Sequence, residues 1–162
     1  MGELIAIICT AEVPAATLSD ILSTAYAKCT DAEPSLVLLT TASPSAMKSL
    51  SYDSVTLPPV ASSNSPFLNM PLDAMLDFMA KNAASTALND GIFLIADDQT
   101  IADSTLLLVD NYTADDETLK TVRIAGDFAN IEPICLSIGT RGIDEILSWV
   151  DPDGILRRYP EP

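Results

Sequence analysis

The stretch GIFLIADDQTIADSTLLLVDNY, Gly91 to Tyr112, holds two continuous aliphatic runs separated by a short acidic segment. Ile92 to Ala96 and Leu106 to Val109 have the length of strands and show no polar alternation, which is typical of strands buried on both faces. We therefore expect both runs to be central strands of a sheet. Asp97 and Asp98 follow the first run directly, so carboxylates gather near strand ends, where open sheets tend to place binding sites.

The residues before this stretch predict a strand, a helix and a second strand. Leu4 to Cys9 and Ser35 to Thr40 are apolar runs of strand length. Between them, Ala15 to Lys28 places Leu, Ile, Ala and Tyr at helical spacing, which gives one apolar helix face. A strand, helix, strand order of this length is typical of a parallel, right-handed crossover.

The remaining elements are read from the same kinds of pattern. We expect a helix from Pro71 to about Leu88 that ends at a left-handed Gly91, a strand at Thr121–Ala125, a short edge strand at Ile134–Ile138, a helix at Ile143–Val150, and a segment Ile155–Tyr159 that pairs or packs. Together the patterns predict an α/β fold, with α+β as the alternative, in a single domain over residues 1–162. We expect a mixed central sheet of about five strands, flanked by three helices.

Residues 41–71 form a long segment rich in Ser and Pro, with eight Ser and five Pro. That composition disfavours regular structure. The segment carries only two charged residues, Lys48 and Asp53, and many apolar ones, whereas disordered linkers are more charged and less apolar. We therefore expect this loop to lie against the body and partly cover something apolar. The alternative is a plain surface loop with local anchors.

The charge of the chain limits its partners. With 23 Asp and Glu against 8 Lys and Arg, the net charge is -15, and residues 90–162 carry 15 of the acids and 5 of the bases. Such a field repels nucleic acid and anionic lipid. The amino-terminal segment has no basic n-region and no run long enough for a membrane span. We expect no nucleic-acid partner, no membrane partner and a cytoplasmic location.

The residue types also exclude common catalytic machinery. The sequence contains no histidine, which removes the usual general base and the usual transition-metal ligand. Cys9, Cys29 and Cys135 show no CxxC spacing and lie in or beside apolar segments, as reduced core thiols do. Neither GxGxxG nor GxxxxGK[ST] occurs, so a nucleotide cofactor is not expected and we assign none.

Three charged residues remain as candidates for chemistry. Asp97 and Asp98 are weak candidates for a hard cation, because their spacing matches no calcium loop and helix capping or solvation explains them equally. Arg123, in TVRIA, projects opposite Val122 and Ile124. It is either an anion anchor and catalytic candidate, or a structural partner of a carboxylate such as Asp110 or Asp127. The structural interpretation is favoured, because most such arginines pair with nearby acids.

The carboxyl-terminal part of the chain resembles a known family. The resemblance rests on GIFLIADDQT, LLLVDNY, TVRIA and, most closely, CLSIGTRGIDEILSWVDPDGILRRY. These segments resemble domain of unknown function family 6924, mainly over residues 91–159. The resemblance implies an α/β fold and brings no established activity. The family pattern has a basic or polar residue at the position of Asp98, and an Asn and an Asp at those of Thr140 and Gly142.

Two functions fit what remains. The first is cofactor-independent binding of an apolar small molecule, with the 41–71 loop as a lid, and cyclisation or isomerisation as the reaction class, since such reactions need mainly positioning. Its predicted substrate-binding residues come from the weakly charged loop, from the methionine face of the following helix and from a tryptophan off the apolar stripe of the last helix: Tyr52, Phe67, Met75, Met79 and Trp149. For the two methionines, core packing is the more common role. The second is a non-enzymatic module whose acidic carboxyl-terminal half docks a basic protein.

Overall fold

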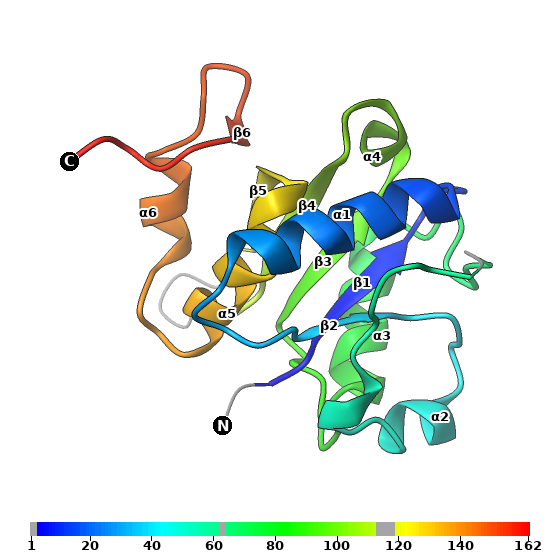
Figure 1. The fold of residues 1–162 in the computed structure, drawn as a ribbon. Helices are drawn as coiled ribbons and strands as arrows, with labels where there is room; N and C mark the ends of the chain where they lie inside the picture. Colours follow the sequence, from blue (N-terminus) through cyan, green and yellow to red (C-terminus); the bar gives the residue numbers. More distant parts are fainter. Residues whose placement is uncertain (1–2, 62–63, 113–118) are drawn as a thin grey trace.

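The fold is a mixed sheet with helices on both faces (Figure 1). A computed structural model describes residues 3–61, 64–112 and 119–162, so parts of the long loop and of the acidic connection after residue 112 lie outside it. Its elements, in chain order, are β1 Ile5–Cys9, α1 Ala15–Lys28, β2 Leu36–Leu38, α2 Pro44–Lys48, a 3₁₀ turn Tyr52–Ser54, α3 Leu72–Asn82, β3 Ile92–Ala96, α4 Asp98–Asp103, β4 Thr105–Asp110, β5 Lys120–Ala125, a 3₁₀ turn Gly126–Phe128, α5 Ile131–Ser137, α6 Ile143–Leu147 and β6 Ile155–Leu156.

The sheet has the order β2-β1-β3-β4-β5-β6. The pairs β1/β2, β1/β3 and β5/β6 are parallel, and β4 runs antiparallel to both of its neighbours. The predicted α/β fold with a mixed sheet is therefore confirmed. The predicted parallel pairing of the first two strands and the central position of the Gly91–Tyr112 runs are confirmed as well.

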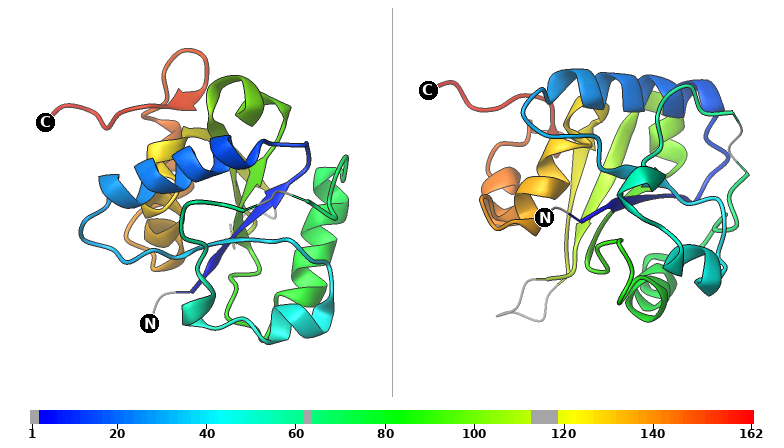
Figure 2. Two further views of the ribbon diagram at one scale, coloured as in Figure 1. Left: turned by 45° about the vertical axis from the view of Figure 1, so that its right-hand side comes forward. Right: turned by 60° about the horizontal axis from the view of Figure 1, so that its bottom comes forward.

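An apolar core lies on each face of the sheet, which explains why the sequences of β1 and β3 are unbroken aliphatic runs. Ile5, Ile7 and Cys9 of β1 face the core shared with α1, α5 and α6, whereas Ala6 and Ile8 face the core shared with α3. Figure 2 shows this layering, with α1 on one side of the strands and α3 on the other. No helix in the described part of the chain combines the length and apolar character that a membrane span needs.

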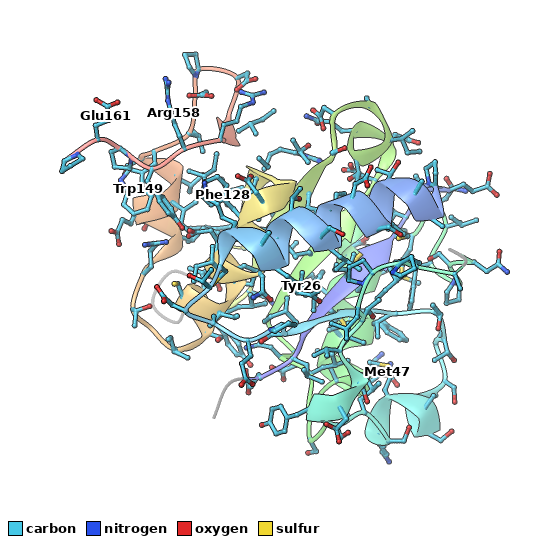
Figure 3. The ribbon with its side chains drawn as sticks, viewed as in Figure 1. Tyr26, Met47, Phe128, Trp149, Arg158 and Glu161 are labelled. Atoms are coloured by element: carbon cyan, nitrogen blue, oxygen red, sulfur yellow. The ribbon has the colours of Figure 1, made fainter. Side chains whose placement is uncertain are left out.

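The long loop is part of the second core. Met47, labelled in Figure 3, and Phe67 have no exposed surface and pack there with Met75 and Met79. Thr56 covers the open edge of β2, because its N–H donates to the Leu36 carbonyl (2.8 Å) and its hydroxyl accepts from the Leu38 N–H (2.9 Å). The described part of the loop is thus anchored at several points, as the lack of charge predicted.

Several predicted elements are wrong in type or extent. The expected edge strand Ile134–Ile138 is mostly helical, within α5, because Pro133 suits a first helical turn, where no N–H donor is needed. The helix after Pro71 ends at Asn82 and not near Leu88. Gly91 does not have a left-handed backbone; a Cβ there would meet the Tyr112 ring at 2.7 Å, so close packing explains this glycine. Three short helices, α2, α4 and α5, were not expected.

The burial of the loop gives a direct test of its role in the core. Met47→Ala should lower the free energy of unfolding by about 2–5 kcal/mol, the usual cost of truncating a fully buried large side chain. Leu57→Ala is the matched control, since Leu57 is in the same loop and is 58% exposed; it should change stability by less than about 0.5 kcal/mol. Equal effects in urea unfolding would show that the loop does not pack as described.

Candidate functional site

The carboxyl ends of β1 and β3 lie next to each other at a point where the chain connections diverge. From β1, α1 leads to β2 across one face of the sheet, whereas α3 leads into β3 from the opposite face. In open α/β sheets, such a divergence opens a crevice outside the carboxyl ends of the two strands, and ligands bind there. The structure has a hollow of about 440 Å³ at this place, called here the carboxyl-edge hollow.

Three separate segments line the carboxyl-edge hollow. They are the residues that follow β1, a turn at the end of the long loop, and the start of α4: Thr10, Ala11, Glu12, Leu68, Asn69, Asp98 and Ile101. The hollow is open to solvent and has both polar and apolar walls. Leu68 and Ile101 are 40% and 44% exposed, so each presents aliphatic surface.

The turn that carries Leu68 and Asn69 is held against β1 by one backbone hydrogen bond and one from a side chain. The Asn69 N–H donates to the Thr10 carbonyl (2.8 Å), and the Ser65 hydroxyl donates to the Cys9 carbonyl (2.5 Å). Asn69 has a left-handed backbone, φ 61°, which Asn tolerates better than most residues. Phe67 is buried next to it and contacts the Phe78 ring edge-to-face, at 5.1 Å between centroids. This turn therefore forms a fixed roof over the end of β1.

The opposite wall is α4, which begins directly after β3 through a capping box. The Asp97 carboxylate accepts from the Thr100 N–H (3.2 Å), and the Asp97 N–H donates to the Thr100 hydroxyl oxygen (2.9 Å). Such reciprocal bonds satisfy helix N–H groups that have no partner within the helix. The capped turn places Asp98 and Ile101 on the hollow.

Arg123 is bound to Asp97 by two hydrogen bonds. Its Nη1 and Nη2 donate to Asp97 Oδ1 (2.9 Å) and Oδ2 (2.6 Å), and its side chain is only 14% exposed. The ladder places Arg123 opposite Leu107 of β4, and Leu107 opposite Ile95 of β3, so the guanidinium reaches across β4 to the end of β3. Arg123 therefore has the structural role that the sequence favoured, as the ion-pair partner of a carboxylate.

The predicted partners of Arg123 were wrong. Asp110 accepts from the Tyr112 N–H (2.9 Å), and Asp127 pairs with Lys28 (3.6 Å). Sequence spacing did not reveal that Asp97, two strands away, is the nearest carboxylate. Burial raises the pKa of the Asp97 carboxyl, but the hydrogen bonds and charge of Arg123, with the bonds from Thr100, outweigh burial and hold this pKa below 3.8.

The edge carboxylates do not form a metal site in the described residues. Asp97 is committed to Arg123 and to its helix cap, and Asp103 accepts from the N–H and hydroxyl of Thr105 (3.0 and 2.6 Å). Across residues 3–61, 64–112 and 119–162, no three Cys, Asp or Glu side chains are grouped so as to hold a metal ion. Of Asp97, Asp98 and Asp103, only Asp98 lines the hollow, where Glu12 is the second acidic residue.

The five residues predicted to bind substrate do not lie together. Phe67, Met75 and Met79 meet in the second core and are at most 1% exposed, so they pack against the sheet. Tyr52 lies at the opposite edge, where it lines a hollow of about 340 Å³ with Glu3, Glu33 and others. Trp149 packs on the first core, near the chain terminus (Figure 3). Of the five, only Phe67, Met75 and Met79 lie close together, and they do so as core residues.

Trp149 belongs to a cluster that the sequence did not indicate. The Arg141 guanidinium lies 4.9 Å from the Trp149 ring and 5.0 Å from the Tyr159 ring, and it donates to Glu132 Oε1 (2.6 Å). The Tyr159 hydroxyl also donates to this oxygen. Glu132 is fully buried, and its Oε2 has no hydrogen-bond partner among the residues that the structure describes. No motif brings these residues together, because their contacts join α5, α6 and the segment after β6.

The cysteines are not candidates for nucleophilic chemistry. Cys9 and Cys29 are buried free thiols, and Cys135 is half-buried. Burial raises the pKa of the Cys9 thiol to about 11, so Cys9 is protonated at neutral pH. The expectation that Cys9 and Cys29 are core thiols is confirmed.

Comparison with known proteins gives a family and no activity. Residues 36–159 match the family described as Domain of unknown function (DUF6924). The chain belongs to this family. The DUF6924 match begins at residue 36, well before the segment that carries the sequence resemblance, so it includes the roof turn, α4 and the Arg123–Asp97 pair. No curated protein and no solved structure matches the chain.

The Arg123–Asp97 pair makes a prediction about stability and pH. Arg123→Met should lower the free energy of unfolding by about 1–2 kcal/mol at neutral pH, between the values for exposed and buried ion pairs. Because the folded-state pKa of Asp97 is lowered, the stability that the pair adds is present above pH 3.8 and is lost as the pH falls from there through the lower folded-state pKa.

Urea unfolding of both proteins from pH 7 to pH 2.5 checks this. The stability difference between wild type and Arg123→Met should shrink across the acidic range. Arg157→Met, which removes an exposed arginine paired with Asp153 (2.7 Å), is the control and should cost less. A difference that stays constant with pH would show that Arg123 acts by packing and not through the Asp97 charge.

Proposed function

We propose that this DUF6924 protein binds a small, partly apolar organic molecule in the carboxyl-edge hollow, without a cofactor. The observation that carries the proposal is the position of the hollow. It lies outside the carboxyl ends of β1 and β3, where their connections cross opposite faces of the sheet, and general experience with open α/β sheets places ligands there. Its volume of about 440 Å³ is within the range of small-molecule sites, about 300–1,000 Å³.

The fixed roof supports this proposal further. Ligand sites are usually largely formed before the ligand arrives. The backbone bond from Asn69 to Thr10 and the buried Phe67 anchor hold the roof in place without a ligand, and the capping box holds α4. Leu68 and Ile101 then present aliphatic surface that a ligand would cover.

Binding is supported better than catalysis. Cyclisation or isomerisation, which fits a chain without histidine, stays a prediction, because it calls for an enclosed apolar pocket. The carboxyl-edge hollow is open and has Glu12 and Asp98 on its walls, and Arg123 is already bound to Asp97. We therefore assign no catalytic residue.

The second candidate is docking of a basic protein on the acidic carboxyl-terminal half. The observation in its favour is that each base of that half already pairs with a carboxylate: Lys120 with Asp144, Arg123 with Asp97, Arg141 with Glu132, Arg157 with Asp153 and Arg158 with Asp151. The carboxylates left in excess then dominate the electrostatic field of this half of the chain. Such docking should weaken steeply with salt, since charges are screened over about 8 Å at physiological ionic strength.

A fragment screen followed by protein-observed NMR tests the small-molecule proposal. Ligands should shift the backbone amides of residues 10–12, 68–69 and 98–101. Ala11→Leu fills part of the hollow and should weaken binding about tenfold or more, since the added side chain occupies ligand volume. Ala84→Leu, at an exposed position outside the hollow, is the matched control and should leave affinity unchanged.

Two results would count against the proposal. One is a screen in which no fragment shifts these amides at concentrations of about 1–5 mM, the affinity range of weak fragments. The other is equal binding by wild type and Ala11→Leu, which would place the ligand elsewhere.

A further inference from the structure

We infer that the ligand of the carboxyl-edge hollow is an organic ammonium: a protonated primary or secondary amine on an aliphatic or aromatic body. This inference rests on the function proposed above and adds the chemical class of the ligand. It draws on three features of the hollow, namely its unpartnered polar groups, its aliphatic walls and its lack of a cation.

Four polar side chains of the hollow have no partner within the described chain. Glu12 and Asp98 make neither a hydrogen bond nor an ion pair with any described residue, and the side chains of Thr10 and Asn69 make no hydrogen bond there either. Elsewhere on the same edge, carboxylates are committed, Asp97 to Arg123 and Asp103 to Thr105. The hollow thus offers two carboxylates, a hydroxyl and an amide, and all four can accept a hydrogen bond.

The charge of the residues that line the hollow favours a cationic ligand. The lining of the hollow contains two acids and no base, and the nearby Arg123 is held by both oxygens of Asp97. The chain as a whole carries a net charge of -15. The Glu12 and Asp98 carboxylates would repel an anionic ligand, whereas a cation would approach down the field and find acceptors for charge-assisted hydrogen bonds.

The remaining chemistry favours an amine with an apolar body over a metal ion. Hard cations take six or more oxygen ligands, mostly from several carboxylates and carbonyls, and the hollow has two carboxylates that the fold does not group with a third. Leu68 and Ile101 stand on its walls with 40% and 44% of their surface exposed. They would cover the hydrocarbon part of an amine and contribute nothing to a bare ion. Primary and secondary ammonium groups also carry N–H donors for these acceptors, which quaternary ammonium groups lack.

A set of three probes on one scaffold tests the charge preference. The probes are 2-phenylethylamine, 2-phenylethanol and phenylacetate, which are cationic, neutral and anionic at pH 7. Each is titrated into the full chain while the amides of residues 10–12, 68–69 and 98–101 are followed by NMR. The amine should bind about tenfold or more tightly than the alcohol, and the acid weakest, because charge-assisted bonds are roughly twice as strong as neutral ones.

A pair of double variants separates the site from the overall field. Glu12→Gln with Asp98→Asn should reduce the affinity for the amine to that for the alcohol. Glu3→Gln with Glu33→Gln removes the same charge from the hollow at the opposite edge, which Tyr52 lines, and should leave the amine preference at the carboxyl edge intact. Thermal unfolding of each variant confirms that it is folded.

Each outcome has a distinct meaning. If the alcohol or the acid binds the carboxyl-edge hollow as tightly as the amine, the ligand class is overturned and the proposed function stands. If the two double variants weaken amine binding equally, or if the amine shifts residues around Tyr52 instead, the ligand class is also overturned. If no probe and no library fragment shifts the hollow, the proposed function falls and the inference with it.

Discussion

Burial of β1 and β3 on both faces is the constraint on which the rest of the structure depends. Each strand is almost wholly aliphatic, and each contributes alternate residues to the two cores. Both faces must therefore be covered, by α1 with α5 and α6 on one side and by α3 with the long loop on the other. The same arrangement sends the connections of β1 and β3 in opposite directions and opens the hollow at their carboxyl ends. One constraint thus sets both the core and the candidate site.

The sequence predicted those elements whose signal is local. Continuous aliphatic runs found β1, β2, β3 and β4, the segment TVRIA found β5, and helical spacing found α1. The short helices α2, α4 and α5 were missed because five to seven residues give too few turns for a clear periodic pattern. Ile134–Ile138 looked like a strand because a short apolar run fits a strand or a helix equally, and Pro133 in the preceding turn favours the helix.

The candidate site could be predicted only in part, since it is assembled from three distant segments. Asp98 was found because carboxylates after a buried strand lie at a sheet edge. Thr10, Glu12 and Asn69 carry no local signal; the bonds from Asn69 to Thr10 and from Ser65 to Cys9 bring the loop to the end of β1. The methionines and Phe67 were assigned to a ligand because apolar residues look alike in sequence whether they face a core or a pocket.

The roof turn is docked on the end of β1 and completes the hollow, and hydrogen exchange at a single amide tests this docking most directly. In the structure, the Asn69 N–H donates to the Thr10 carbonyl at 2.8 Å. NMR-detected exchange in D₂O should find this amide strongly protected, as expected of a hydrogen bond that opens only with the surrounding structure. An Asn69 amide that exchanges at the rate of an unstructured peptide, while the amides of β3 stay protected, would contradict the account.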